Sequence, residues 1–219
     1  MWSGNMNKKV QTIFEQTLKQ QPELRTCRDQ MEEAFAVLRD CYRQSGKVLV
    51  CGNGGSAADS EHIVGELMKG FLEPRPLPET QIARLRKLYG NEGEKLGRRL
   101  QGALPAISLV SQISLCTAIT NDVSADMVFA QQVFGYARPG DVLIGISTSG
   151  NAVNVINAVK VARALEVRTI ALSGQGGALK DLAELTIAVP GSATARIQEL
   201  HMAAYHALCA ALEAELFGG

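Results

Sequence analysis

Two side chains able to carry protons, His62 and Glu66, lie four residues apart in the stretch CGNGGSAADSEHIVGELM, residues 51–68. Positions i and i+4 of an α-helix share one face, so this imidazole and this carboxylate can work at the same point. A histidine–carboxylate pair on a helix is also common as a plain solvated surface pair. The sequence around the pair is therefore needed to distinguish a role in proton transfer from a structural role.

A glycine turn comes just before the pair. The apolar run 48–50 predicts a buried strand, and Asn53, Gly54 and Gly55 predict a tight turn, because adjacent glycines adopt backbone angles that other residues avoid. We expect Ser56 to be the N-cap of the following helix. Backbone N–H groups and the positive end of the helix dipole favour an anion at such a place. A phosphate cradle beside an imidazole–carboxylate pair predicts chemistry on a phosphorylated substrate.

A second loop of the same kind follows the apolar run 142–146. Ser147, Thr148 and Ser149, with a glycine after them, are expected to open a helix and to surround a phosphate with neutral donors. A plain N-cap with spare serines would look similar, but the same arrangement after two strands favours a ligand. The loop has no P-loop lysine, which argues against a nucleoside triphosphate with magnesium.

The last predicted helix, residues 194–216, carries the other two histidines. His201 and His206 are five residues apart and point to different faces. Gln198 and His206 lie on one i, i+4 ridge through Met202, so we expect these two to reach one site and His201 to have a structural role.

Strands and helices alternate along most of the chain. This rhythm predicts an α/β fold, with a parallel sheet covered by helices on both faces and sites at the carboxyl ends of the strands. Besides 48–50, the predicted strands are residues 106–110, 142–146, 167–172 and 185–189. Predicted helices cover residues 113–120, 127–136, 153–165 and 194–216.

Two segments lie outside this rhythm. Residues 9–45 predict one short and one long helix broken at Pro22, whose apolar faces need a partner surface, for which a second subunit is a natural choice. Residues 79–102 predict a basic helical insertion interrupted at Gly90 and Gly93. We expect its leucine stripe to pack on the main domain or on a neighbouring subunit. A solvated face is favoured for its basic side, over a flap above an anionic substrate.

The bulk composition is that of a single soluble domain of 219 residues, with 46% hydrophobic and 20% charged residues. Lys+Arg and Asp+Glu are both 22, which gives no case for nucleic acid or an anionic membrane as partner. No apolar run is long enough to span a bilayer, and no signal sequence is recognisable at the start. Five cysteines without CxxC spacing predict reduced thiols in a cytoplasmic protein.

Three motifs together resemble one family. CGNGGSAADSEHIVGEL, GISTSGNAVNVI and ARIQELHMAAYH are similar to the sugar isomerase (SIS) domain of the bacterial phosphoheptose isomerases, over about residues 10–218 except 79–102. These enzymes interconvert sedoheptulose 7-phosphate and D-glycero-D-manno-heptose 7-phosphate, and feed heptose and lipopolysaccharide precursor synthesis. The resemblance implies a single SIS domain over residues 1–219, a three-layer α/β/α sandwich that assembles as a homotetramer with active sites between subunits.

The resemblance also implies roles for individual residues. It implies one zinc ion per subunit and proton transfer between C1 and C2 through an enediol, with Glu66 and His206 as the acid–base pair. A zinc-bound carboxylate is a weaker base, so the two roles of Glu66 are in tension. The implied metal ligands are His62, Glu66, Gln198 and His206. The implied substrate-binding residues are Asn53, Gly54, Gly55, Ser56, Asp122, Ser147, Thr148, Ser149 and Gln198.

Two departures from the family pattern leave the sugar open. Ala152 stands where the family often has a serine, which removes a phosphate donor, and Ala195 stands where it often has an aspartate. The alternatives are an isomerase of another phosphosugar and a non-enzymatic branch that binds the replication initiator DnaA. A sugar-phosphate-sensing transcription regulator would need a DNA-binding domain, for which the N-terminal helices are not basic enough. Presence of both Glu66 and His206 favours an enzyme.

Overall fold

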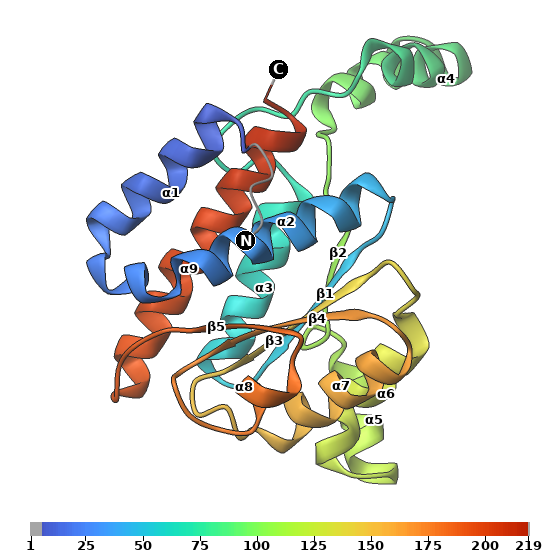
Figure 1. The fold of residues 1–219 in the computed structure, drawn as a ribbon. Helices are drawn as coiled ribbons and strands as arrows, with labels where there is room; N and C mark the ends of the chain where they lie inside the picture. Colours follow the sequence, from blue (N-terminus) through green and yellow to red (C-terminus); the bar gives the residue numbers. More distant parts are fainter. Residues whose placement is uncertain (1–5, 219) are drawn as a thin grey trace.

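The computed structural model describes residues 6–218, and residues 1–5 and 219 lie outside the described part. Its centre is a five-stranded parallel sheet with the strand order β2-β1-β3-β4-β5 (Figure 1). Every residue of β1 and β3 is buried, as expected for strands covered on both faces. The strands are β1 (Val48–Gly52), β2 (Ala106–Ser108), β3 (Val142–Ser147), β4 (Arg168–Ser173) and β5 (Leu185–Ala188).

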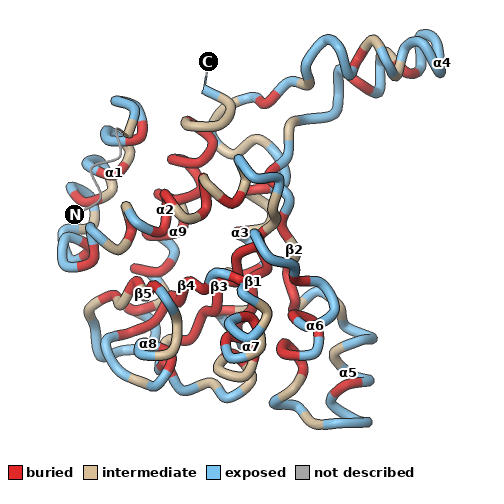
Figure 2. Tube along the Cα trace, turned by 45° about the vertical axis from the view of Figure 1, so that its right-hand side comes forward, coloured by how far each residue is buried: buried red, intermediate tan, exposed pale blue. Residues whose placement is uncertain are grey.

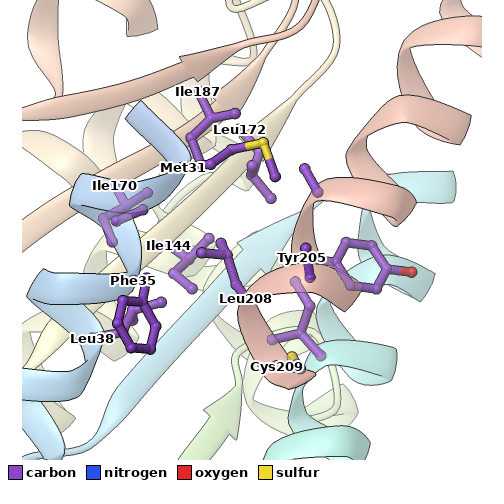
Figure 3. Packing of buried hydrophobic residues seen from close by; sticks show 14 of the residues in the cluster. Met31, Phe35, Leu38, Ile144, Ile170, Leu172, Ile187, Tyr205, Leu208 and Cys209 are labelled. Carbon is purple, nitrogen blue, oxygen red and sulfur yellow. The ribbon is translucent and has the colours of Figure 1, made fainter. Parts of the chain in front are cut away.

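Four helices pack on one face of the sheet and bury the larger core. This core includes Val48 and Val50 of β1, while the alternate residues Leu49 and Cys51 face the other side. Figure 3 shows part of this core, where α2 and α9 meet the strands through Met31, Phe35, Leu38, Ile144, Ile170, Leu172, Ile187, Tyr205, Leu208 and Cys209. The four helices are α1 (Lys8–Gln20), α2 (Arg28–Arg43), α3 (Gly55–Met68) and α9 (Thr194–Leu216), with the 3₁₀ turn η1 (Pro22–Cys27) between the first two.

The N-terminal helices find their apolar partner within this chain. The break at Pro22 is confirmed, and α1 and α2 both pack against α9. Val10, Phe14 and Phe35 are fully or almost fully buried there. The expectation that these faces need a second subunit for their burial was therefore wrong, because the long C-terminal helix covers them.

The opposite face carries α5 (Ile113–Asp122), η2 (Ala125–Met127), α6 (Val128–Tyr136), α7 (Val153–Ala164) and the short α8 (Leu179–Leu182). Together the two helical layers and the sheet give the predicted three-layer α/β/α sandwich. Helix α8 was not predicted, because four residues after a glycine loop carry no readable periodicity. Asn121 and Asp122 are the last residues of α5, which extends two residues beyond the predicted helix 113–120.

Helix α4 (Glu79–Arg99) stands away from the rest of the chain as an arm (Figures 1 and 2). The predicted break lies at Gly90, with φ 60° and ψ −138°, whereas Gly93 is helical and lies inside the second half. The two halves pack on each other so closely that a Cβ on Gly93 would lie 2.1 Å from the Leu85 carbonyl oxygen. A β-bridge between Pro76 and Gln101 closes the base of the arm.

The leucine stripe of this arm is not covered by the main domain. Leu88, Leu96 and Leu100 keep 64%, 50% and 46% of their surface exposed. The prediction that the leucine stripe packs on the main domain of the same chain was therefore wrong, because each half of the arm covers only the inner face of the other. A neighbouring subunit remains the predicted alternative.

Two bulk expectations concern the whole described chain. The five cysteines Cys27, Cys41, Cys51, Cys116 and Cys209 are free thiols, as predicted. Among residues 6–218, the structure contains no helix with the length and apolar character needed to span a membrane.

Candidate active site

The site lies where the strand order reverses. Strands β1 and β3 are neighbours, but the chain leaves β1 toward β2 and returns to β3, so their carboxyl ends flank the topological switch point. Parallel α/β sheets bind ligands outside the strand ends at this point. The loop after β1 and the start of α7 are tied together there, because Asn53 and Asn154 exchange two amide hydrogen bonds of 2.8 and 2.9 Å.

The first glycine loop makes a sharp entry into α3. Gly54 is the N-cap, with φ 55° and ψ −120°, a conformation that favours glycine. Ser56 was expected at the N-cap but is the second residue of α3 and is almost fully buried. That expectation was wrong because the second glycine of the turn, Gly55, already belongs to the helix.

The side chain of Gln198 lies against Gly55. A Cβ on Gly55 would lie 2.1 Å from the amide nitrogen of Gln198, so the start of α3 and the side chain from α9 are in direct contact. Gln198 therefore lies at the phosphate-cradle end of α3 in this structure.

The second loop ends where predicted, with α7 beginning at Val153, and it is held by a neighbouring loop. Ser147 is the last residue of β3 and is buried, Thr148 is half-buried and Ser149 is exposed, and α7 begins only at Val153. The backbone N–H of Asn151 donates to the Ser149 hydroxyl at 3.2 Å. Backbone bonds then join the loop to residues 174–179, which fixes its shape.

The proton-carrying side chains form one cluster between α3 and α9. The Nε2 atom of His62 lies 3.3 Å from Oε1 of Glu66 and 3.4 Å from Nε2 of His206. The His62 side chain is 42% exposed and the Glu66 side chain 13% exposed, so a ligand from solvent can reach the imidazole while the carboxylate is largely shielded. Sequence spacing predicted the His62–Glu66 pair, and the packing of α3 on α9 adds His206.

The environment of His206 favours its neutral imidazole. Burial lowers the pKa of His206, and the neighbouring His62 lowers it further, while Glu66 opposes the shift. A neutral imidazole has a lone pair for a proton or a metal ion at neutral pH. Burial also raises the pKa of Asp59, against the opposing effects of Tyr205 and His62.

The donor types fit a zinc ion, and two of their pairwise separations match its geometry. Zinc bonds of about 2.0–2.1 Å to nitrogen and oxygen place two ligands of a tetrahedral ion roughly 3.3–3.4 Å apart. The His62–Glu66 and His62–His206 separations have these lengths. Within the described residues, no three His, Cys, Asp or Glu side chains converge on one metal position as they stand.

Two other predicted site residues lie apart from this cluster. Gln198 and His206 are eight residues apart on α9, about 12 Å along the helix axis. The Gln198 amide therefore meets the start of α3 rather than the cluster. Asp122 ends α5, is exposed, and accepts a hydrogen bond from Asn121.

Sequence reasoning missed a buried ion pair behind the cluster. The Arg75 Nε donates to Oε1 of Glu213 at 2.7 Å, and both side chains are almost fully buried. Two further Arg75 nitrogens donate to the backbone carbonyls of Leu67 and Glu66. The pair thereby fixes the end of α3 that carries Glu66.

The same pair positions an aromatic ring against the cluster. The Glu213 carboxylate accepts hydrogen bonds from the backbone N–H groups of residues 71–73. This holds the Phe71 ring with its centroid 5.4 Å from that of His206. No sequence signal pointed to Glu213, because it lies in an apolar helix 138 residues from Arg75.

Comparison with known proteins places the chain in a family. It matches the SIS domain family over residues 8–100 and 99–174, so the fold and the site define a SIS-domain protein. It is 38% identical to the phosphoheptose isomerase of Akkermansia muciniphila over 190 residues, 86% of this chain and 87% of that protein. It is 43% identical to that of Geobacter sp. strain M21 over 188 residues, 85% of this chain and 84% of that protein.

A solved structure agrees with these relatives. The phosphoheptose isomerase of Neisseria gonorrhoeae superposes with a TM-score of 0.71 at 32% identity, covering 94% of this chain and 98% of that one. The chain belongs to the phosphoheptose isomerase family of SIS-domain proteins.

Proposed function

We propose that this chain interconverts sedoheptulose 7-phosphate and D-glycero-D-manno-heptose 7-phosphate by proton transfer between C1 and C2 through an enediol. The cluster of His62, Glu66 and His206 beside two loops at the switch point is the observation that supports this function. The named relatives are phosphoheptose isomerases, which favours a seven-carbon substrate.

Glu66 and His206 are the proposed acid–base pair. The carboxylate is 13% exposed, and a shielded base is protected from competing water protons. The neutral His206 accepts or returns a proton on the substrate oxygen as the enediol forms and collapses. A positioned acid or base of this kind contributes about 10²–10⁴-fold to the rate.

Neutral donors hold the phosphate. Ser147, Thr148 and Ser149 lie after β3, and the start of α3 at Gly55 and Ser56 lies after the neighbouring β1. Because the phosphate does not react, these contacts stabilise the bound substrate and the transition state alike. Asn53, Gly54, Asp122 and Gln198 are the other proposed contacts of the substrate.

One zinc ion per subunit is proposed at the cluster, held by His62, Glu66 and His206, with Gln198 as the fourth ligand. Zinc at this place would polarise the substrate carbonyl oxygen. The Gln198 amide lies at Gly55, so its part in the ligand set requires the side chain to leave that contact.

The proposed assembly is a homotetramer in the cytoplasm with sites at subunit interfaces. Large apolar side chains remain exposed on the α5–α6 side of the chain, which favours contact with further copies. Ile113, Val123 and Phe134 have 73%, 67% and 64% of their surface exposed. The free thiols favour a reducing compartment. Sedimentation of the purified protein measures the oligomer.

The deciding experiment is an isomerase assay of purified protein with sedoheptulose 7-phosphate, followed by ¹H NMR of the product. Metal-depleted, zinc-reloaded and chelator-treated samples are compared with the Glu66→Gln variant as control. We expect turnover that needs zinc and disappears in the variant. Faster turnover of a pentose 5-phosphate would assign another sugar, and no turnover of any sugar phosphate with zinc present would contradict the enzyme assignment.

A further inference from the structure

A tyrosine hydroxyl links His62 to a half-buried carboxylate. The hydroxyl of Tyr205 lies 3.0 Å from Nδ1 of His62 and 3.2 Å from Oδ1 of Asp59. Tyr205 is almost fully buried on α9, while Asp59 lies three residues before His62 on α3. Figure 3 shows the Tyr205 ring at the edge of the apolar core with its oxygen directed away from the other labelled side chains.

The number of protons available determines which group donates in each hydrogen bond between His62, Tyr205 and Asp59. A phenol has one proton, and burial raises the pKa of Tyr205 above its usual value, so at about pH 8 the hydroxyl donates one hydrogen bond and accepts others. An ionised carboxylate only accepts, so the Tyr205 proton goes to Asp59, where the bond is charge-assisted. The Tyr205 oxygen is then an acceptor for His62, and Nδ1 of His62 must carry the imidazole proton.

The environment of Asp59 also favours a hydrogen bond donated by Tyr205 to this carboxylate. Its second oxygen, Oδ2, is buried without a hydrogen-bond partner. Within the part of the chain that the structure describes, the Tyr205 hydroxyl is the hydrogen-bond donor to this carboxylate. Turning the phenol toward His62 would leave this half-buried carboxylate without a protein donor, which costs more than a lost bond between neutral groups.

We propose that Asp59 and Tyr205 are positioning residues that fix His62 in the Nδ1–H tautomer and keep its Nε2 lone pair in the cluster. The inference deepens the proposed function, because Nε2 is the atom that faces Glu66 at 3.3 Å and His206 at 3.4 Å. The Glu66 carboxylate alone would favour a proton on Nε2, so the Asp59–Tyr205 pair has to outweigh it, while an N–H on Nε2 of His206 can donate to the His62 lone pair. In metal sites a partner of this kind orients the ligating imidazole and raises its basicity. Sequence position alone shows only that Asp59 and His62 share a helix face.

Asp59→Asn tests the direction of these hydrogen bonds, because it removes the anionic acceptor. An asparagine can present its amide N–H to the Tyr205 oxygen, an option that the carboxylate lacks, so the phenol proton is released toward His62 and the population moves toward the Nε2–H tautomer. Tyr205→Phe removes the link without reversing it, so a mixture of tautomers is expected. Tyr42→Phe is the matched control, since the buried Tyr42 hydroxyl has no hydrogen-bond partner within the described chain.

The primary measurement is ¹⁵N NMR of metal-free protein with labelled histidines at about pH 8. The chain has three histidines, and the His62 signals are those lost in His62→Gln. We expect the Nδ1–H pattern in the native protein and in Tyr42→Phe, and a shift toward Nε2–H in Asp59→Asn. An Nε2–H pattern in the native protein, or an unchanged tautomer in Asp59→Asn, overturns the proposal.

Zinc affinity, measured by competition with a chelator, is the second measurement. Loss of such a partner typically weakens metal binding about 10–100-fold, and we expect this for Asp59→Asn but not for Tyr42→Phe. Equal affinity in all variants contradicts the positioning role. The tautomer is read in metal-free protein without substrate, so failure of the isomerase assay of the native protein would count against the proposed function and leave the tautomer result standing.

Discussion

Replacing Arg75 by methionine should destabilise the fold more than any surface ion-pair change. Arg75 and Glu213 have 0% and 2% of their side-chain surface exposed and are joined at 2.7 Å. Arg75 also donates to the carbonyls of Leu67 and Glu66, and its guanidinium lies 4.8 Å from the centre of the Phe217 ring. The substitution keeps a side chain of similar length but removes the charge and all of these donors.

The size of the effect follows from what remains buried. Removing one partner of a buried ion pair costs about 3–5 kcal/mol, because the other charge is left without compensation. Glu213 keeps the backbone donors of residues 71–73, which favours the lower part of that range, about 3 kcal/mol. Arg28→Met is the matched control, since the exposed Arg28–Glu32 pair should contribute only about 0.3–0.5 kcal/mol.

Urea unfolding at one fixed protein concentration measures both variants, because assembly makes apparent stability depend on concentration. A loss below about 1 kcal/mol for Arg75→Met would refute the reasoning, since it would mean that the Glu213 charge is not held by Arg75. The double variant Arg75→Met/Glu213→Met should recover part of the loss, because no charge then stays buried.

The pH dependence of the same pair has a defined sign. Burial alone would raise the pKa of Glu213, but the N–H donors of Phe71 and Leu72 and the Arg75 guanidinium outweigh it, so the pKa is lowered from 4.5. A lowered pKa contributes stability that is present above the unfolded value and is lost as pH falls through the folded value. The difference in the free energy of unfolding between the native protein and Glu213→Gln should therefore be largest near neutral pH and become smaller below pH 4.5. A difference that grows on acidification would contradict this.

Three further predictions concern the site and the arm. Glu66→Gln should keep the circular dichroism spectrum and lower kcat about 10²–10⁴-fold, and near-normal turnover would remove Glu66 from the acid–base pair. Ser149→Ala should mainly raise KM, because phosphate binding is shared by ground and transition states, and a pure kcat effect would contradict that role. Replacing residues 79–100 by a short Gly-Ser linker keeps the bridge between Pro76 and Gln101. Because the leucines of the arm are exposed in the single chain, we expect a smaller oligomer by sedimentation with an intact fold. An unchanged oligomer with a raised KM would instead support a flap over the substrate.

The fold was largely predictable because its elements have strong periodicity. The last helix begins at Thr194 and ends at Leu216 as predicted, since its apolar positions run without a glycine or proline for 23 residues. The buried strands were equally clear. Errors arose where one residue type can serve two purposes. Gly93 predicted a break in the helix, but in the structure this glycine allows the two halves of the arm to touch.

The site was predictable only as far as one helix determines it. Spacing on α3 pairs His62 with Glu66, but the rotation of α9 against α3 decides which α9 residues join them. That rotation depends on packing of the whole core and is not encoded in an i, i+4 rule. For the same reason the contact of Tyr205 with His62 was not predicted, although Tyr205 directly precedes a predicted site residue.

Parallel packing of α3 and α9 divides the site into two ends. Gly55 and Gln198 touch at the beginning of the seam, and His62 and His206 meet further along it. Seven residues of α3 separate Gly55 from His62, about 10 Å along the axis. A substrate whose phosphate lies at the helix start must therefore have its reacting carbons several bonds away to reach the histidines. This geometry favours a long sugar phosphate over a short one, and it ties the substrate length to the packing of two helices rather than to any single side chain.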